Sequence, residues 1–231
     1  MIQWIMNHSI WFMLAIAAVY NSLWLIQYKE KLRIKEWVAV ILAVSHMVLS
    51  ILLAKTLAFI EGVPGGMSLY GGLFGLPTVF IFVALMTHRN ISTVCDVFTI
   101  PSIVTVTCAR MNCLISGCCL GTVIPGTDGL RWPTRELELI LYVALYIFLR
   151  NKIKKKGYNG KLYPIYMISY GAFRFIIEWL RESNNTISFF HLSHIWSLLA
   201  IAIGVAIICF LNNKTDNKPH SKHKMVKKEV K

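Results

Sequence analysis

The sequence has few acidic residues and few charged residues of either sign. Only 11 of its 231 residues are Asp or Glu, against 24 Lys and Arg, and charged residues make up 15% of the chain while hydrophobic residues make up 56%. This composition, with a mean hydropathy of +0.57, excludes an ordinary soluble domain and indicates a membrane protein that crosses the bilayer several times. A net charge of +13 could suggest a nucleic-acid partner, but the topology explains the charge better, so we expect no such partner.

The amino-terminal stretch lacks the features of a cleaved signal peptide. Residues 1–8, MIQWIMNH, contain no Lys or Arg, and no small-residue cleavage site follows the first apolar run. A secretory signal begins with a basic segment and ends at such a site. We therefore expect the first run to be retained as a helix. The chain also lacks visible internal repeats.

The cysteines lack the spacing of a metal or disulfide framework. Most of them lie inside apolar stretches, where an extracellular framework would not place them; they are Cys95, Cys108, Cys113, Cys118, Cys119 and Cys209. The group at 113, 118 and 119 has no paired C-x-x-C and no neighbouring His, so we predict neither a metal site nor a cofactor. A disulfide between Cys118 and Cys119 would be strained because adjacent Cα atoms are only about 3.8 Å apart. We expect free, buried thiols.

Seven apolar runs are long enough to cross about 30 Å of hydrocarbon. They lie near 4–27, 37–60, 70–88, 93–116, 133–150, 162–181 and 191–212. The prediction is an all-α integral membrane protein with seven transmembrane helices, which form one membrane domain at residues 1–212. Residues 213–231 are predicted to be a basic, disordered cytoplasmic tail.

Basic residues concentrate in alternate loops. Of the 24 Lys and Arg, 18 lie at 29–35, 89, 150–161 and 214–231. The positive-inside rule places those loops in the cytoplasm, which puts the N-terminus outside and the C-terminus inside. The other six lie in helices or on the outer side, where we interpret them as ligand or ion-pair groups; they are Lys55, Arg110, Arg131, Arg135, Arg174 and Arg181.

An arginine lies deep in the fourth run, which then ends in small residues. Residues 110–121 read RMNCLISGCCLG. A charge inside the hydrocarbon is costly and usually functional, and irregular backbone survives at membrane depth only where protein or water lines it. We predict that Arg110 faces a buried site for an anionic ligand, with Cys113, Gly117 and Gly121 along its wall.

The sixth run carries four polar residues on one face. Tyr170, Arg174, Glu178 and Arg181 fall within about 80° of one another at 100° per residue. Arg174 and Glu178 could form an ion pair that only holds the bundle together, or Glu178 could orient Arg174 toward an anion. Glu138, one turn into the fifth run, could pair with either buried arginine or simply favour the helix start.

The third run begins Tyr70-Gly71-Gly72-Leu73. Its glycines could allow close helix packing, or could present free amide groups to an anion near a helix N-terminus. Tyr70 could be an interfacial aromatic residue or part of the same site.

Taken together, these motifs resemble the prolipoprotein diacylglyceryl transferase family. The order is that of the family: Gly71-Gly72-Leu73, Arg110 to Gly121, Pro133 to Glu138, then Tyr170, Arg174 and Glu178. The resemblance implies a monomeric enzyme of the bacterial plasma membrane that needs no cofactor. It implies transfer of a diacylglyceryl group from phosphatidylglycerol, or another anionic glycerolipid, to the lipobox cysteine next to a prolipoprotein signal peptide.

The resemblance also implies a role for each matching residue. Catalytic roles fall to Tyr70, Arg110, Arg174 and Glu178. Substrate-binding roles fall to Gly71, Gly72, Cys113, Gly117, Gly121, Glu138, Tyr170 and Arg181.

Three motifs depart from the family pattern. The family has His where this chain has Tyr70, Asn where it has Cys113, and Asn-Gly-Glu where it has Ser116-Gly117-Cys118. Tyrosine, with a pKa of about 10, is a poorer base than histidine. Alternatives therefore remain: a divergent member with another acceptor or donor lipid, a non-catalytic lipid-binding membrane protein, or a thiol-based redox or metal-handling protein.

Overall fold

The computed structural model describes residues 2–63, 66–157, 159–181, 186–187, 190–191 and 192–216, and the fold is almost entirely helical. Its elements in chain order are α1 (Ile2–Gln27), α2 (Lys29–Leu32), α3 (Glu36–Ile60), α4 (Leu69–Met86), α5 (Ile91–Ser116), α6 (Thr134–Lys156), α7 (Leu162–Glu178), β1 (Thr186–Ile187), β2 (Phe190–His191) and α8 (Leu192–Asp216). The two strands form a small antiparallel pair. The seven long helices match the seven apolar runs of the sequence.

Five helices within the described residues are long and apolar enough to cross a membrane: α1, α3, α4, α5 and α8. They confirm the prediction of a multi-pass helical membrane protein. The other two long helices are less apolar or shorter: α6 ends in a cluster of basic residues, and α7 has 17 residues. Helix α8 continues to Asp216, and the rest of the predicted tail, 217–231, lies outside the described residues.

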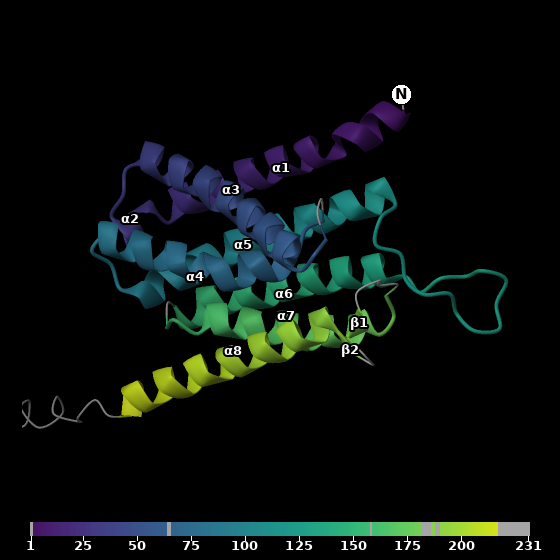
Figure 1. The fold of residues 1–231 in the computed structure, drawn as a ribbon. Helices are drawn as coiled ribbons and strands as arrows, with labels where there is room; N and C mark the ends of the chain where they lie inside the picture. The colour runs from purple at the N-terminus through teal and green to yellow at the C-terminus, as the bar shows by residue number, and fades with distance from the viewer. Residues whose placement is uncertain (1, 64–65, 158, 182–185, 188–189, 217–231) are drawn as a thin grey trace, which may run out of the picture.

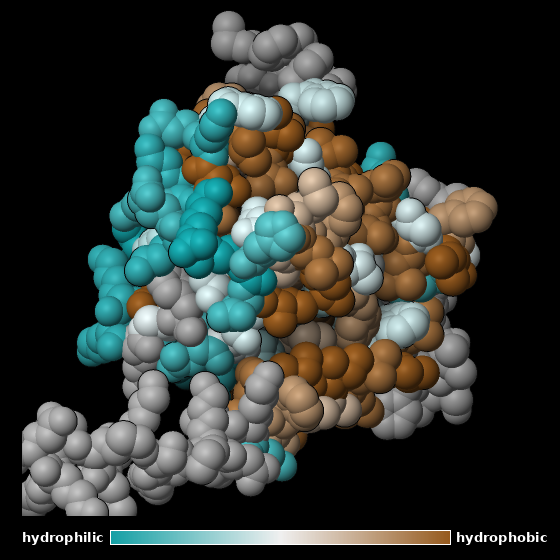
Figure 2. All heavy atoms as spheres, turned by 90° about the vertical axis from the view of Figure 1, so that its left-hand side faces the viewer, coloured by the Kyte–Doolittle hydropathy of each residue, from teal (hydrophilic) through white to brown (hydrophobic). Residues whose placement is uncertain are grey.

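The long helices run side by side, with α1 and α3 at one edge and α8 at the other (Figure 1). The connection α2 lies at one end of the bundle, while the loop between α5 and α6 projects from the opposite end. Figure 2 looks onto the α2 end, where hydrophilic side chains gather on one part of the surface beside a broad hydrophobic part. The α2 end of the bundle therefore carries a concentrated hydrophilic surface.

Buried polar side chains tie α5 to its neighbours. The amide of Asn21 on α1 donates to Thr105 Oγ1 at 3.0 Å, and the Trp24 indole donates to the Val97 carbonyl at 3.0 Å. His46 on α3 meets Ser102 at 3.1 Å. In hydrocarbon such hydrogen bonds add a contact that apolar packing cannot supply. Because these contacts lie along α5, they fix the helix that carries Arg110.

A buried carboxylate fixes the chain entering α7. Asp96, near the start of α5, accepts hydrogen bonds from the backbone N–H groups of Gly160 at 2.7 Å and Leu162 at 2.9 Å. Those amides precede or begin α7, so they have no partner inside that helix. Asp96 thus sets the position of α7 relative to α5, and with it the position of Arg174 relative to Arg110.

Gly71 and Gly72, in the first turn of α4, differ in how closely the backbone of α3 approaches them. A Cβ built on Gly71 would lie 2.1 Å from the Leu53 carbonyl oxygen, whereas one on Gly72 would lie 3.5 Å from the Ser50 carbonyl. We expect Gly71→Ala to push α3 and α4 apart and lower the free energy of unfolding by about 1–3 kcal/mol. Gly72→Ala is the matched control, with an ordinary contact and little loss. Thermal unfolding in detergent measures both, and equal melting temperatures for the two variants would contradict the packing assignment.

Candidate functional site

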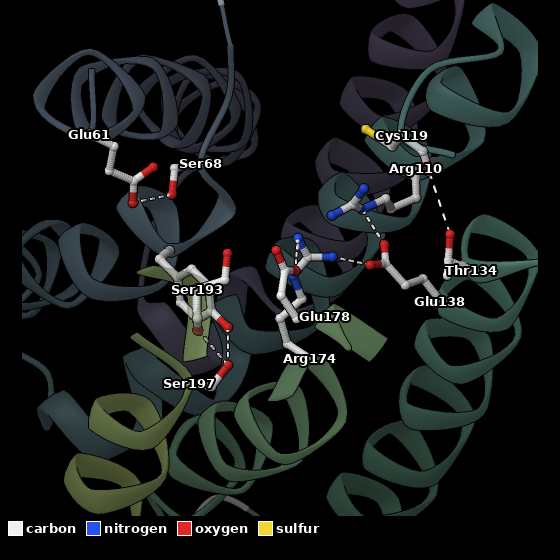
Figure 3. Close-up of polar contacts among 11 residues, drawn as sticks. Glu61, Ser68, Arg110, Cys119, Thr134, Glu138, Arg174, Glu178, Ser193 and Ser197 are labelled. Carbon is white, nitrogen blue, oxygen red and sulfur yellow. Dashed lines mark hydrogen bonds and ion pairs between the residues drawn. The ribbon is translucent and has the colours of Figure 1, made fainter. Parts of the chain in front are cut away.

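Four charged side chains from three helices meet at the end of the bundle opposite α2 (Figure 3). Glu138 on α6 lies between two arginines: its Oε2 is 2.6 Å from Arg110 Nε on α5, and its Oε1 accepts from Arg174 Nη1 on α7. Arg174 Nη2 is also 3.0 Å from Glu178 Oε2, one turn further along α7. The arginines of the fourth and sixth apolar runs therefore converge on one carboxylate.

All four side chains are buried. Arg110 and Arg174 are each 6% exposed, while Glu138 and Glu178 are 1% and 2% exposed. Two positive and two negative charges cancel, and this neutrality is what makes burial of so many ions tolerable. We name Arg110, Glu138, Arg174 and Glu178 the charge quartet.

The sequence places each member of the charge quartet by simple helix geometry. Arg110 lies in the last two turns of α5, Glu138 in the second turn of α6, and Arg174 and Glu178 in the last turns of α7. The last two are four residues apart, so they share a helix face. Because α5 and α7 end where α6 begins, all four charges reach the same level of the bundle.

Two tyrosines, one on α6 and one on α7, lie near the charge quartet. Tyr142 and Tyr170 stack with ring centroids 5.9 Å apart and planes 12° apart. Both contribute to a mostly apolar cavity of about 240 Å³ between these helices, together with Leu141, Ala144, Leu145, Phe148, Ser169 and Phe173. The sequence pattern pointed to Tyr170 but not to Tyr142, although Tyr142 lies four residues after Glu138 and so on the same face of α6.

Tyr70 on α4 contacts both α7 and α8. Its hydroxyl lies 2.5 Å from Ser197 Oγ on α8, and the Ser197 hydroxyl donates to the Ser193 carbonyl. Its ring meets Tyr170 edge-on, with centroids 5.4 Å apart. Tyr70 therefore packs against Tyr170 on α7, and its hydroxyl is bonded to Ser197 on α8.

A further carboxylate lies at the same end of the bundle (Figure 3). Glu61, just after α3, accepts a hydrogen bond from the Ser68 hydroxyl at 3.0 Å. Burial raises the pKa of Glu61 above its ordinary value. Glu61 was not predicted from the sequence as a site residue, because a single glutamate in a glycine-rich loop belongs to no recognisable motif.

The selected glycines act through the backbone. Gly71 and Gly72 pack against α3, and Gly72 also borders a small apolar cavity of about 40 Å³ between α3, α4 and α5. Gly117 ends α5 in the left-handed conformation with φ of 72°, as a helix C-terminus favours. A Cβ on Gly121 would lie 2.2 Å from the Trp132 carbonyl oxygen, so this glycine allows the two sides of the loop between α5 and α6 to approach each other closely.

The loop between α5 and α6 returns to the end of α7. Thr122 donates its backbone N–H to the Leu180 carbonyl at 2.9 Å, and Gly121 forms a bridge with Arg181. This pairing brings Arg181 beside Cys119. A hydrogen bond from Cys113, together with the charges of Arg181 and Arg110, lowers the pKa of the Cys119 thiol below its ordinary value. Arg181 therefore adds a positive charge next to the neutral charge quartet.

Three of the cysteines come together here. The sulfur atoms of Cys113, Cys118 and Cys119 all lie within 4.8 Å of one another, and all six cysteines of the chain are free. Their spacing in the sequence did not predict this cluster. The turn that follows α5 creates it, because Cys118 and Cys119 fold back toward the helix that carries Cys113.

Comparison with known proteins gives a consistent result. Residues 7–210 match the family model described as prolipoprotein diacylglyceryl transferase. Similar curated proteins are named phosphatidylglycerol–prolipoprotein diacylglyceryl transferase. That of Chlorobaculum tepidum is 28% identical over 169 residues, which cover 66% of this chain and 58% of that protein. That of Cronobacter sakazakii is 29% identical over 182 residues, or 62% of each chain.

A relative of the same name from Rickettsia typhi is 26% identical over 181 residues, which cover 70% of this chain and 69% of that protein. The chain thus covers less than two thirds of the Chlorobaculum and Cronobacter proteins.

Proposed function

Because the chain belongs to the prolipoprotein diacylglyceryl transferase family, we propose that it is a membrane transferase that moves a diacylglyceryl group from phosphatidylglycerol to the lipobox cysteine thiol of a prolipoprotein. The observation that carries the proposal is the convergence of Arg110 and Arg174 on Glu138. The acceptor is the cysteine that follows the prolipoprotein signal peptide.

The reaction makes one bond and breaks one. The acceptor thiol loses its proton, its sulfur attacks the terminal glycerol carbon of the diacylglyceryl group, and an S–C bond forms. The C–O bond to the phosphate breaks, and glycerol phosphate leaves with the electron pair. Negative charge therefore grows on the phosphate, where fixed cations lower the barrier most effectively.

The charge quartet suits this task. An arginine has five N–H donors in a planar fork. Arg110 meets Glu138 through Nε, and we propose that its two terminal NH₂ groups donate to phosphate oxygens. Glu138 and Glu178 hold the guanidinium groups in place before the lipid arrives, and preorganised charges of this kind need not rearrange during the reaction. Arg181, beside the quartet, supplies positive charge that no member of the quartet cancels.

The cavity between α6 and α7 suits a lipid. Its lining is mainly Leu, Ala and Phe, and Tyr142 and Tyr170 also contribute to it. We propose that an acyl chain or the glycerol backbone occupies this cavity while the phosphate reaches Arg110 and Arg174. The tyrosine hydroxyls would then face the glycerol oxygens.

The topology we propose has all seven long helices crossing a bacterial plasma membrane, with the N-terminus outside. The basic residues at 29–35, 89 and 150–161 belong to the end of the bundle at which α2 lies (Figure 1), and that end would face the cytoplasm. The charge quartet lies toward the other end. The site would therefore open to the outer leaflet, on the side where an exported prolipoprotein presents its cysteine.

A transfer assay tests the proposal directly. Purified full-length protein is placed in vesicles that contain phosphatidylglycerol labelled in its acyl chains, and a lipobox peptide is added. We expect labelled diacylglyceryl peptide and free glycerol phosphate from the wild type, and none from Arg110→Ala. Full activity in Arg110→Ala would overturn the assignment of the site.

A second candidate function is lipid binding without turnover. It is favoured by Tyr70, which replaces the histidine of the family pattern and has its hydroxyl bonded to Ser197. In the same assay, retained phosphatidylglycerol with no labelled peptide would identify this function and refute the transferase.

A further inference from the structure

The thiol cluster of Cys113, Cys118 and Cys119 has the composition of a site for a soft metal ion. Its sulfur atoms lie within 4.8 Å of one another. Sulfurs around one Zn²⁺, each at a Zn–S distance of about 2.3 Å, lie about 3.8 Å apart. Closing the cluster onto an ion therefore requires side-chain movements of about 1 Å.

The backbone that follows α5 brings the sulfurs to one point. Adjacent residues of an extended chain direct their side chains to opposite sides. Here Gly117 and Cys119 both adopt left-handed conformations, with φ of 72° and 61°. A non-glycine residue rarely adopts this conformation unless the surrounding structure holds it there. The resulting turn places Cys118 and Cys119 on the same side, next to Cys113 in the last turn of α5.

Hydrogen bonds and a neighbouring charge surround the cluster. The Ser116 hydroxyl donates to Cys118 Sγ at 3.4 Å, and Thr134 donates to the Cys119 carbonyl at 3.5 Å. Such outer contacts commonly orient metal-binding side chains. Three thiolates with one Zn²⁺ carry a single negative charge, and the neighbouring Arg181 carries a positive one. The cluster with its ion would therefore be electrically compensated.

We propose that Cys113, Cys118 and Cys119 bind one Zn²⁺ and leave its fourth position open for the thiol of the acceptor cysteine. The identity of this fourth ligand rests on the proposed function, whereas the three-cysteine site does not. A thiol that binds Zn²⁺ is deprotonated. The proton passes to solvent, and the zinc-bound sulfur attacks the glycerol carbon as glycerol phosphate leaves.

This role would account for two departures from the family pattern together. The chain lacks the family histidine that could deprotonate the acceptor, and it has Cys113 and Cys118 where the family has Asn and Glu. Figure 3 places Cys119 next to Arg110. A sulfur activated at this cluster would thus lie close to a phosphate held by the arginines, as attack on the adjacent carbon requires.

The metal content of the purified protein tests the site without reference to activity. The full chain is purified in detergent under reducing conditions without a chelator, and zinc is measured by elemental mass spectrometry. We expect one Zn²⁺ per chain in the wild type and in Cys108→Ser, a control on α5 outside the cluster. Cys119→Ser and Cys113→Ser are expected to bind Zn²⁺ at least about 10–100-fold more weakly. Replacement by Co²⁺ should give the visible absorption of a tetrahedral thiolate site in the wild type and in Cys108→Ser, but not in Cys113→Ser or Cys119→Ser.

Three results would overturn the site: no zinc in the wild type even after Zn²⁺ is added, equal zinc in Cys108→Ser and Cys119→Ser, or a disulfide among the three cysteines. The transfer assay separates the two proposals. Zinc at one ion per chain without transfer refutes the transferase and keeps the site. Full transfer by the Cys113→Ser, Cys118→Ser, Cys119→Ser triple variant refutes the acceptor thiol as fourth ligand and keeps the transferase.

Discussion

Replacing Glu138 with glutamine should destabilise the protein more than any other single change of charge at the site. The substitution keeps the size of the side chain and removes the negative charge between Arg110 and Arg174, whose guanidinium groups are only 6% exposed. The quartet then carries a net positive charge that neither water nor another quartet carboxylate offsets. Breaking a buried ion pair in this way costs about 3–5 kcal/mol. Thermal unfolding in detergent should show a large fall in melting temperature.

Glu136→Gln provides the matched control. Glu136 lies two residues before Glu138, in the first turn of α6. Its side chain is 43% exposed, and its carboxylate is 3.8 Å from the Arg135 guanidinium. Exposed ion pairs contribute little, so this variant should melt close to the wild type. If Glu138→Gln melted as the control does, the quartet would not be the buried, charge-balanced unit described above.

Replacing Arg174 with lysine should nearly abolish transfer and leave the protein folded. Lysine keeps the positive charge and therefore the neutrality of the quartet. It lacks the planar fork, so it cannot contact Glu138, Glu178 and a phosphate at the same time. Loss of one group that stabilises developing negative charge typically lowers turnover by about 10²–10³-fold. The rate of labelled lipid transfer and the melting temperature, measured on one preparation, separate catalysis from folding.

Arg135→Lys is the control for this experiment. Arg135 begins α6 at the same end of the bundle, pairs with the exposed Glu136, and is not a member of the quartet. Its replacement should leave the transfer rate unchanged. A transfer rate for Arg174→Lys equal to that of Arg135→Lys would show that a simple positive charge suffices at position 174.

The sequence predicted the helices and the charged site because both follow from local rules. Apolar runs long enough to cross hydrocarbon leave few alternatives to a helix, and the long helices begin and end near the predicted bounds. Arg110 and Arg174 were identified because a charged side chain within the hydrocarbon is energetically costly and usually functional. The pairing of Glu138 was anticipated only as one of several possibilities, since sequence alone cannot say which helices are neighbours.

The features of the site that the sequence did not predict depend on contacts between segments far apart in the chain. The hydroxyl of Tyr70 meets Ser197, which is 127 residues away in the chain, and no local pattern could indicate that orientation. Tyr142 was overlooked because one tyrosine in an apolar helix resembles ordinary packing. The thiol cluster was missed because the expected metal motifs are regular spacings, whereas here a left-handed turn at Cys119 brings adjacent cysteines together.

The orientation in the membrane remains a prediction that an accessibility experiment can settle. Under the proposed topology, single cysteines introduced into a cysteine-free variant at residue 31 and at residue 128 lie on opposite sides of the membrane. An impermeant thiol reagent added to intact cells should label position 128 and spare position 31. Labelling of position 31 instead would reverse the orientation and place the site in the inner leaflet.

The most direct test of the central claim is a structure of the full chain determined with phosphatidylglycerol bound. We predict phosphate oxygens about 3 Å from the guanidinium nitrogens of both Arg110 and Arg174, with Glu138 still in contact with the two side chains. A phosphate bound elsewhere, with Arg110 and Arg174 closed on Glu138 and out of reach of the lipid, would contradict the account.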